Sequence, residues 1–407
     1  MQHNPDSDDD NGSIEDTVVI GIDFGTTGQI NLITAWPGTG RDEGKVPTEL
    51  LYKNGEVLWG YEIPPDAKSA RWFKLLLLRD EDLSAELRKS EYIQHGRDML
   101  SEMGKSAIDV TADYLRMLSQ HTLETIRKSR GESVVDALRF HIVITVPAIW
   151  KDYARQSMKE AVQKAGLLKP RAAGPTTLAF SPEPGGRAAL ATLCEPGRKT
   201  EKDDVFIICD AGGGTVDLIS YKIDSTGPIA MHEAVEGSGD LCGGIFIDEA
   251  FEKLCKSRLG NRWNNLSTAG IREIITGEWE TAIKPQYKPK ARKSEYIVRI
   301  PAEAFRHSSL DDLSKEPIIK NGRVHFTGKH IQGTFTDSFS RIDRLIDDQV
   351  DMATGAGLNT TGIILVGGLG ASPYLYMHLK KKYTAAGIDV LQSTGINPQG
   401  DLNGVKI

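Results

Sequence analysis

A glycine-rich turn between two apolar segments constrains this chain more than any other stretch of its sequence. It lies in residues 205–223, VFIICDAGGGTVDLISYKI, where the run 205–208 has the length and branching of a buried strand and apolar residues alternate after the turn. Three consecutive glycines let backbone N–H groups close around an anion, and Asp210 is placed to act on the bound group. No Lys follows the glycines and the chain leaves the turn as a strand, which excludes a P-loop. We predict a β-hairpin that binds phosphate.

The same pattern occurs near the N-terminus, in residues 18–33, VVIGIDFGTTGQINLI. An apolar strand again runs into an aspartate, a short turn and a partly alternating second strand. Aligning the two stretches places Asp23 on Asp210, Gly25 on Gly212, and Thr26 and Thr27 on Gly213 and Gly214. Two related hairpins in one chain indicate two pseudo-equivalent lobes that face the phosphate chain of one nucleotide.

The length and charge of the chain limit the classes of function that it can serve. At 407 residues it is long enough for two or three domains, or for two lobes that each have a core. It carries 49 Lys and Arg against 56 Asp and Glu, a net charge of −7, and its isoelectric point is near 5.8. A surface that follows phosphates needs an excess of basic side chains, so general nucleic-acid or anionic-membrane binding is not expected. The one basic cluster, residues 284–293, contains two prolines and is expected to be a solvated loop.

Cysteine usage and the N-terminal sequence indicate the compartment. The four cysteines form no CxxC pair and no His is spaced for zinc, so a reduced, cytoplasmic environment is expected, with Cys209 as a core residue. No run approaches the ~20 apolar residues of a membrane span. Residues 1–16 are acidic and polar, unlike a signal or transit peptide, and are expected to be disordered.

Hydrophobic periodicity and turn residues predict the remaining elements. In the first half of the chain we predict strands at 50–52 and 57–59 around an Asn54-Gly55 turn, a helix at 108–127, a buried strand at 140–146 and a helix at 151–168. After the glycine hairpin we predict a second glycine-dense turn at 237–244 that leads into a helix, a helix-rich stretch containing Trp263, Trp279 and Ile283, and a β-rich portion at 296–326. The last elements are a helix at 335–352, a strand with a tight turn at 363–370, and a helix from Pro373.

Five motifs, in this order, resemble the nucleotide-binding domain of the 70-kilodalton heat-shock chaperones. They are IGIDFGTT at 20–27, ITVPAIW at 144–150, DAGGGTVD at 210–217, GDLCGGIF at 239–246 and ILVGGLGASP at 364–373. The LVGGLGASPYL form and the RWFKLLL segment are similar to the divergent heat-shock protein family A member twelve branch and its fungal relatives. The resemblance implies the α/β actin-like ATPase fold, in which two lobes flank a nucleotide cleft and each has an RNase H-like core and a smaller outer subdomain.

The same resemblance implies the domain boundaries. Residues 17–202 would form lobe I, with its outer subdomain at about 37–108, and residues 203–407 would form lobe II, with its outer subdomain at about 239–330. Residues 399–404 lack the pattern of the family's final lobe II helix. We therefore expect that helix and the peptide-binding domain that follows it in the family to be missing.

Catalytic and metal-binding roles follow from the resemblance, position by position. Asp23, Glu183 and Asp210 would hold Mg²⁺, mostly through water, because hard oxygen ligands suit this ion. Lys74, in the RWFK segment, would place a cation on the γ-phosphate and the attacking water, and the Thr215 hydroxyl would orient that water. From the residues alone, the default interpretation of Lys74 is the snorkelling neighbour of an apolar cluster, and the alternative for Thr215 is an ordinary turn residue.

Nucleotide contacts are implied in the same way. The phosphates would be bound by Gly25, Thr26, Thr27, Gly212, Gly213 and Gly214 with Asp217 behind them, the ribose and adenine would face Gly243, Gly244, Gly367 and Gly368, and the adenosine would be clamped by Glu280 and Lys284.

Three departures from the family pattern bear on function. Gly28 replaces an aromatic residue next to the nucleotide, Leu369 and Ala371 replace polar and basic residues near adenine, and no peptide-binding module is recognised. The leading hypothesis is a chaperone-like protein that binds and hydrolyses Mg-ATP, with cochaperones or client proteins as partners. A nucleotide-binding regulatory module with little turnover and a truncated, poorly folding family member remain as alternatives. A sugar kinase on the same fold is disfavoured because no acceptor carboxylate is recognised.

Overall fold

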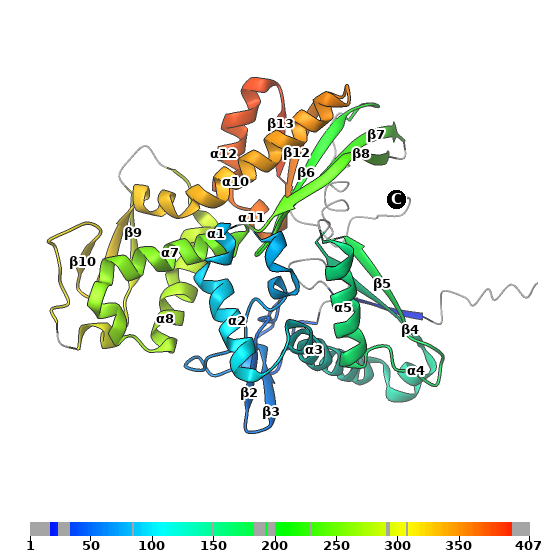
Figure 1. Ribbon diagram of the computed structural model, residues 1–407, viewed down its shortest axis with the longest axis horizontal. Coiled ribbons are helices and arrows are strands. Elements are labelled where there is room, and N and C mark those ends of the chain that lie inside the picture. The colour runs from blue at the N-terminus through cyan, green and yellow to red at the C-terminus, as the bar shows by residue number, and fades with distance from the viewer. Residues whose placement is uncertain are drawn as a thin grey trace, which may run out of the picture.

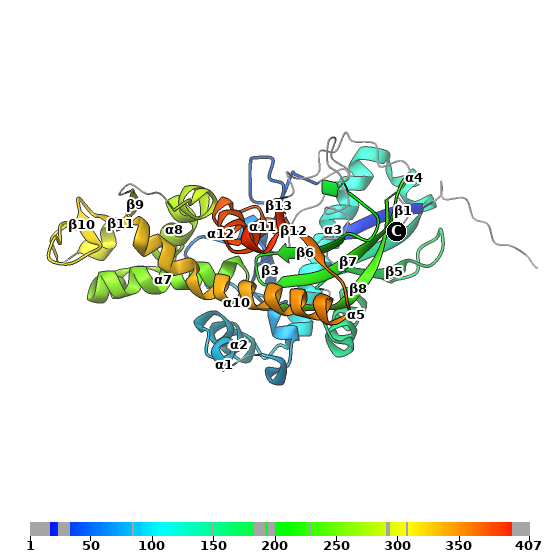
Figure 2. The same cartoon turned by 90° about the horizontal axis from the view of Figure 1, so that it is seen from above.

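The computed structural model describes residues 17–22, 33–83, 85–147, 150–182, 192–193, 200–227, 229–289, 294–306 and 308–392. Two larger sheets organise these residues, and each carries helices on its faces (Figures 1 and 2). The first contains the strands β1-β4-β5 and the second the strands β13-β12-β6-β7-β8. This mixed α/β arrangement is consistent with the expected actin-like ATPase fold.

The first sheet is parallel and contains β1 (Thr17–Ile22), β4 (Arg139–Val146) and β5 (Thr177–Pro182). Every second residue of β4 is buried, so one face of the strand belongs to the core. That face packs on the helices α3 (Ala107–Arg130) and α5 (Asp152–Ala165), which contribute residues to the same apolar cluster. The strand predicted at 140–146 and the helices predicted at 108–127 and 151–168 are thereby confirmed, with α5 ending at Gly166 in the left-handed conformation.

The central strands of the second sheet, β6 and β12, are buried on both faces. The strands of this sheet are β6 (Val205–Ala211), β7 (Val216–Thr226), β8 (Ile229–Asp240), β12 (Thr360–Val366) and β13 (Asp389–Gln392). Ile207 and Cys209 belong to one apolar cluster, with residues of α10 (Gly328–Gly355) and α12 (Pro373–Tyr383), whereas Phe206 and Ile208 belong to another. A strand that is buried on both faces reads as a continuous apolar run, which is why 205–208 could be recognised.

The predicted hairpin is confirmed, since β6 and β7 pair antiparallel with Asp210 opposite Asp217. The predicted turn at 237–244 is wrong in its first half, because residues 237–240 are the end of β8. A Cβ on Gly237 would lie 3.0 Å from the Leu218 carbonyl oxygen, so glycine here permits close strand packing. Strand β8 was not predicted from the sequence.

Two smaller groups of elements lie outside the main sheets (Figure 1). The first has the hairpin β2 (Leu50–Lys53) and β3 (Glu56–Trp59), joined by a turn in which Asn54 and Gly55 both have positive φ, followed by α1 (Ala85–Arg88) and α2 (Glu91–Met103). The second has α7 (Gly244–Leu259), α8 (Thr268–Ile274), the π-helix η6 (Ile275–Ile283), α9 (Lys284–Gln286) and the strands β9 (Glu295–Arg299), β10 (Ile318–Lys320) and β11 (Arg323–Thr327).

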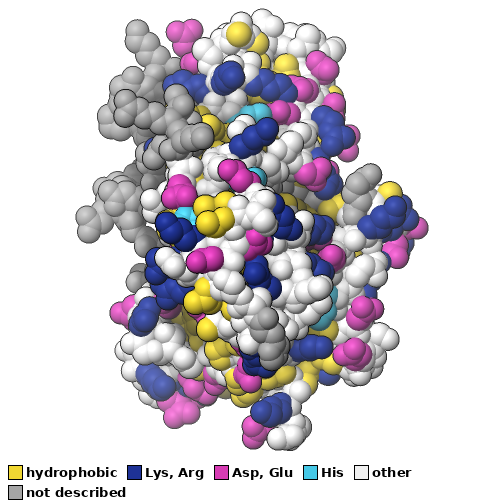
Figure 3. All heavy atoms as spheres, turned by 90° about the vertical axis from the view of Figure 1, so that its left-hand side faces the viewer, with side chains coloured by type: hydrophobic (Ala, Val, Ile, Leu, Met, Phe, Trp, Pro, Cys, Tyr) yellow, Lys and Arg dark blue, Asp and Glu magenta, His cyan; other side chains and the backbone are white. Residues whose placement is uncertain are grey.

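The remaining elements are short. They are α4 (Glu132–Ala137), α11 (Gly367–Gly370) and the 3-10 helices η2 (Gly60–Glu62), η3 (Leu75–Leu77), η4 (Asp80–Asp82), η5 (Gly260–Asn265), η7 (Ala302–Phe305) and η8 (Thr384–Ala386). None of the described helices is long and apolar enough to cross a membrane. The face that carries α8 and β9 shows acidic and basic side chains interspersed, without a large area of one sign (Figure 3).

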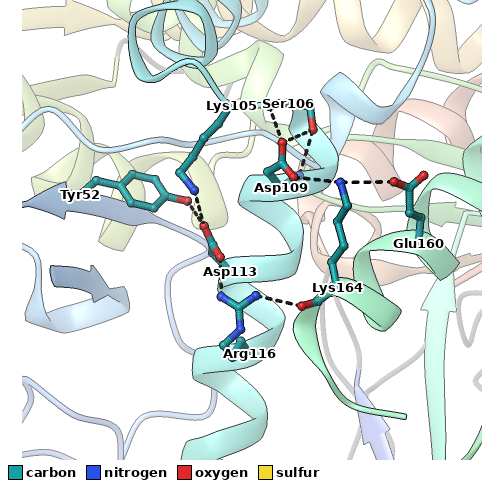
Figure 4. A network of polar contacts seen from close by, with 8 residues as sticks. All are labelled: Tyr52, Lys105, Ser106, Asp109, Asp113, Arg116, Glu160 and Lys164. Carbon is teal, nitrogen blue, oxygen red and sulfur yellow. Dashed lines mark hydrogen bonds and ion pairs between the residues drawn. The ribbon is translucent and has the colours of Figure 1, made fainter. Parts of the chain in front are cut away.

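Two aspartates of α3 join the β2–β3 hairpin and α5 to this helix (Figure 4). Asp113 accepts hydrogen bonds from the Tyr52 hydroxyl at 2.8 Å and from Lys105 at 2.9 Å, and it also pairs with Arg116. Burial alone would raise the pKa of Asp113, but these three donors outweigh it and hold the pKa below its ordinary value of 3.8. Asp109 has a lowered pKa as well, because it accepts hydrogen bonds from Ser106 and forms an ion pair with Lys164.

This network predicts a loss of stability in acid. A carboxylate whose pKa is lower in the folded state stabilises the fold above its unfolded pKa of 3.8, and this contribution disappears as the pH falls through the folded pKa. We expect the free energy of unfolding to decrease between about pH 5 and about pH 3, and to decrease less in Asp113→Asn. The exposed Asp98→Asn serves as the control. Equal acid sensitivity of Asp113→Asn and wild type in urea titrations would contradict this prediction.

A buried glutamine joins α10 to the second sheet. Gln349 accepts a hydrogen bond from the Ser220 hydroxyl at 2.6 Å, and its amide donates to the Glu236 carbonyl at 2.9 Å and to Ser238 at 3.0 Å. We expect Gln349→Leu to lower the free energy of unfolding by about 2 kcal/mol, because buried polar partners would be left without hydrogen bonds. Denaturant unfolding measures this change. The exposed Gln163→Leu on α5 should change it by less than about 0.5 kcal/mol.

Candidate functional site

The glycine turn of the β6–β7 hairpin is held on one side by the start of α7. The Gly212 amide donates to the Thr215 carbonyl at 2.9 Å and closes the turn. The amides of Gly243, Gly244 and Ile245 donate to the carbonyls of Gly214, Gly212 and Gly213, at 3.2, 3.1 and 2.8 Å respectively. All three carbonyls of the glycine run are therefore hydrogen-bonded to the same helix terminus.

Two backbone amides of this turn, unlike its carbonyls, have no hydrogen-bond partner in the described part of the chain. They are the N–H groups of Gly213 and Gly214. A Cβ on Gly213 would meet no atom within 4 Å, so the turn borders open space at this residue. Successive backbone amides without a protein acceptor, at a turn of this kind, form an anion-binding concavity.

Two further predicted glycines pack directly against this hairpin. A Cβ on Gly243 would lie 2.7 Å from the Gly212 carbonyl oxygen, and one on Gly367 would lie 2.4 Å from Asp210 Oδ1. Gly367 also has φ +83°, which favours glycine. These glycines let α7 and α11 approach the turn closely. Their predicted contacts with ribose and adenine, and those of Gly244 and Gly368, stay predictions.

The turn opens onto a cavity of about 670 Å³, a size typical of small-molecule sites. Six of the predicted site residues line it: Lys74, Gly212, Gly213, Gly214, Thr215 and Glu280. Its other lining residues come both from the described residues up to 182, around the first sheet, and from those after 200, around the second, which we call the first and the second lobe. The ammonium group of Lys74 lies 5.7 Å from the centre of the Trp150 ring, and Trp150 and Pro147 form part of the same wall. The cavity thus places a cation and the turn in one enclosure.

Two acidic residues of the hairpin lie next to its glycine turn. Asp210 is half-buried beside Gly367, and Asp217, directly opposite it, is only 4% exposed. Thr215 is 7% exposed and lies between the glycines and β7. Their predicted contacts with Mg²⁺, water and phosphate are not tested by this geometry.

The other predicted phosphate and metal residues lie outside the described part of the chain: Asp23, Gly25, Thr26, Thr27 and Glu183. The strands before them are described. β1 ends at Ile22 and β5 at Pro182, in parallel with β4, after which the chain reaches Pro147 and Trp150 in the cavity wall. The carboxyl ends of parallel strands are a common location for ligand-binding residues.

The predicted adenosine clamp contains an ion-paired cluster. Lys284 is within 2.8 Å of Asp248 Oδ1 and also pairs with Glu280, and the Trp279 indole N–H donates to Asp248 at 2.7 Å. Burial lowers the pKa of Lys284, but the two carboxylates outweigh burial and raise it, whereas burial raises the pKa of Glu280. Glu280 and Asp248 line the cavity and lie on the π-helix η6 and on α7. The contribution of Asp248 was not predicted from the sequence.

A second cluster that sequence reasoning missed joins the two lobes across the cavity. Glu49 pairs with Arg71 of its own lobe at 3.0 Å and with Arg272 of α8 at 3.1 Å, and Ser69 donates to the same carboxylate at 2.9 Å. Glu49 and Arg272 are 223 residues apart, and no local sequence pattern connects them.

No group of three or more His, Cys, Asp or Glu that could hold a metal ion is present among the described residues. Two of the three predicted Mg²⁺ residues lie outside that part of the chain, and the third, Asp210, is a hard oxygen donor beside the glycine turn. The donor chemistry at Asp210 and the turn amides thus fit a magnesium-bound phosphate chain.

Comparison with known proteins agrees with this geometry. Residues 106–253, which contain β4, α5 and the β6–β7 hairpin, match the family model described as Hsp70 protein. The chain is 27% identical over 314 residues to human heat shock 70 kDa protein 12B, and 31% identical over 261 residues to chaperone protein DnaK of Stenotrophomonas maltophilia. The chain is thus similar to Hsp70 proteins, as its motifs predict.

The matches to these Hsp70 relatives are partial on both sides. Each covers 58% of this chain, and the shares of the relatives are 44% for the human 12B protein and 37% for DnaK. Mouse heat shock 70 kDa protein 12A is 26% identical, with 59% of this chain and 45% of the relative covered. The chain spans less than half the length of the curated relatives that it matches. The predicted resemblance to the Hsp70 family and to its member twelve branch is confirmed.

Proposed function

We propose that this chain binds Mg-ATP between its lobes and hydrolyses it. The observation that carries the proposal is the glycine turn. Its carbonyls accept hydrogen bonds from the start of α7, and Gly213 and Gly214, whose amides have no acceptor in the described part of the chain, line the cavity together with Lys74. Phosphoryl transfer to water requires positioned donors and positive charge rather than covalent chemistry. The turn supplies backbone donors and Lys74 supplies a cation in the same enclosure.

Each residue has a definite part in this proposal. The amides of the turn would bind phosphate oxygens, and Lys74 would stabilise the charge on the terminal phosphate. Asp23, Glu183 and Asp210 would hold Mg²⁺ through water, and Thr215 would orient the attacking water. Mg²⁺, when bound, neutralises charge on the phosphates. Movement of the lobes with the nucleotide state would then act on cochaperones or client proteins.

Single-turnover kinetics test the proposal. The chain is mixed with a slight deficit of labelled Mg-ATP, and phosphate release and nucleotide binding are followed together in wild type and in Asp210→Ala. We expect release in wild type and a loss of about 100-fold or more in the variant, as for removal of a group that stabilises the transition state. Tight binding without release in wild type would instead establish a regulatory module, and failure to bind any adenine nucleotide would contradict both functions.

A further inference from the structure

Helix α2 of the first lobe and helix α7 of the second form an interface beside the cavity. Figures 1 and 2 show the two helices close together in both views. Glu249 of α7 accepts a hydrogen bond from the Glu91 amide at 2.8 Å and from the Ser90 hydroxyl at 3.0 Å. Ser90 makes no capping bond within its own helix, so a carboxylate of the opposite lobe caps the start of α2. We call this contact, with the contacts of Tyr92 described next, the α2–α7 interface.

Tyr92 extends the α2–α7 interface toward the cavity. Its hydroxyl donates to Glu252 of α7 at 3.0 Å, and its ring stacks on Trp72, with centroids 4.2 Å apart and planes 9° from parallel. All three residues line the cavity. Apolar side chains complete the contact, since Leu75 and Ile93 share a buried cluster with Leu241 of the second lobe.

The segment clamped in this way is the one that carries Lys74. Trp72 has φ +55°, a conformation that is strained for a bulky residue and persists where its surroundings enforce it. A Cβ on Gly96 of α2 would lie 2.9 Å from Leu76, so α2 packs closely on the residues that follow Lys74. On the other side, a Cβ on Gly214 of the turn would lie 3.1 Å from the Leu75 side chain, so Leu75 lies close to the turn. Lys74 therefore sits between a residue stacked on α2 and a residue packed on the glycine turn.

We propose that Tyr92 and Glu249 are positioning residues that present Lys74 to the phosphates only when the two lobes are closed. The proposal rests on the function proposed above. When the lobes separate, Glu249 leaves the start of α2 and Glu252 leaves Tyr92, so the stack that constrains Trp72 is no longer anchored to α7. Closure of the lobes would therefore place the Lys74 ammonium group at the reacting phosphate at the same time.

The test uses three variants of the full chain. Tyr92→Phe removes the hydroxyl and keeps the stacked ring, and Glu249→Ala removes the cap of α2. Lys253→Met is the matched control, because Lys253 pairs with Glu249 within α7 at 2.9 Å and its side chain is 53% exposed. The rate at which limiting acetic anhydride acetylates Lys74 is measured by mass spectrometry, without nucleotide. We expect a severalfold rise in the first two variants and no change in the control.

Single-turnover phosphate release gives the second readout. In Tyr92→Phe and Glu249→Ala we expect release to slow by about tenfold while the nucleotide Kd changes by less than about twofold, because misplacement of a catalytic group affects the chemical step most. Unchanged Lys74 acetylation in a folded Tyr92→Phe and Glu249→Ala overturns the positioning role, whatever the rates of release. If Glu249→Ala does not fold, unchanged acetylation in Tyr92→Phe alone overturns it. Raised acetylation together with a wild type that does not release phosphate supports the positioning role and contradicts the proposed hydrolysis.

Discussion

Gly243→Ala is expected to weaken binding of Mg-ADP by about 100-fold, because forcing a methyl group into a close-packed contact costs up to about 3 kcal/mol. The added Cβ would lie 2.7 Å from the Gly212 carbonyl oxygen and from two Gly213 backbone atoms. Gly243 has φ −73°, which any residue adopts, so the effect comes from space and not from backbone strain. The turn would have to move away from the start of α7, which holds its three carbonyls.

The neighbouring residue provides the control for this prediction. A Cβ on Gly244 would be 3.9 Å from the nearest hairpin atom, an ordinary van der Waals contact. We expect Gly244→Ala to weaken Mg-ADP binding much less than Gly243→Ala does, because its added methyl group would make only ordinary van der Waals contacts with the hairpin. Isothermal titration calorimetry measures both affinities. Equal affinities for the two variants would show that nucleotide binding does not depend on the turn.

Trp279→Ala is expected to lower the free energy of unfolding by about 4 kcal/mol, within the range for deleting a large aromatic side chain from a core. Trp279 is fully buried in η6 and stacks on Phe251, with centroids 3.9 Å apart and planes 3° from parallel. Its indole N–H also donates to Asp248, which pairs with Lys284. The substitution therefore creates a cavity and removes one partner of the ion-paired cluster.

Trp279→Phe is a milder change. Phenylalanine keeps part of the stack on Phe251 but removes the hydrogen bond to Asp248 and some ring volume, so a loss of about 1 to 2 kcal/mol is expected. Denaturant titrations that follow far-ultraviolet circular dichroism give both values. A loss below about 1 kcal/mol for Trp279→Ala would mean that η6 is not part of the cooperative core of the second lobe.

Local patterns in the sequence predicted the parts of the fold that local residues determine. The β6–β7 hairpin follows from one apolar run, three glycines and one alternating strand, all within residues 205–223. Strand β8 could not be recognised in the same way, because five of its residues are polar or glycine at 236–240 and are held there by the distant Gln349. A strand of polar residues has no recognisable sequence pattern when its hydrogen-bond partners lie on a distant element.

The candidate site likewise contains residues that short motifs predicted and residues that depend on distant partners. Lys74 and the glycine turn were predicted from residues within short motifs, and the structure brings them to one cavity. Asp248, Glu252 and the Glu49–Arg272 pair were missed, because each acts through a partner on the other lobe or on another helix. Contacts between residues that are far apart in the chain depend on how the two lobes pack against each other. A single sequence carries no local pattern for that packing.

The three hydrogen bonds between the start of α7 and the glycine turn have a mechanical consequence. The same helix carries Asp248, Glu249 and Glu252, which contact the ion-paired cluster, the start of α2 and Tyr92. An α-helix transmits displacement along its axis with little bending over four turns. A rotation of α7 about the turn would therefore displace the turn, the contacts with the first lobe and the Lys284 cluster together.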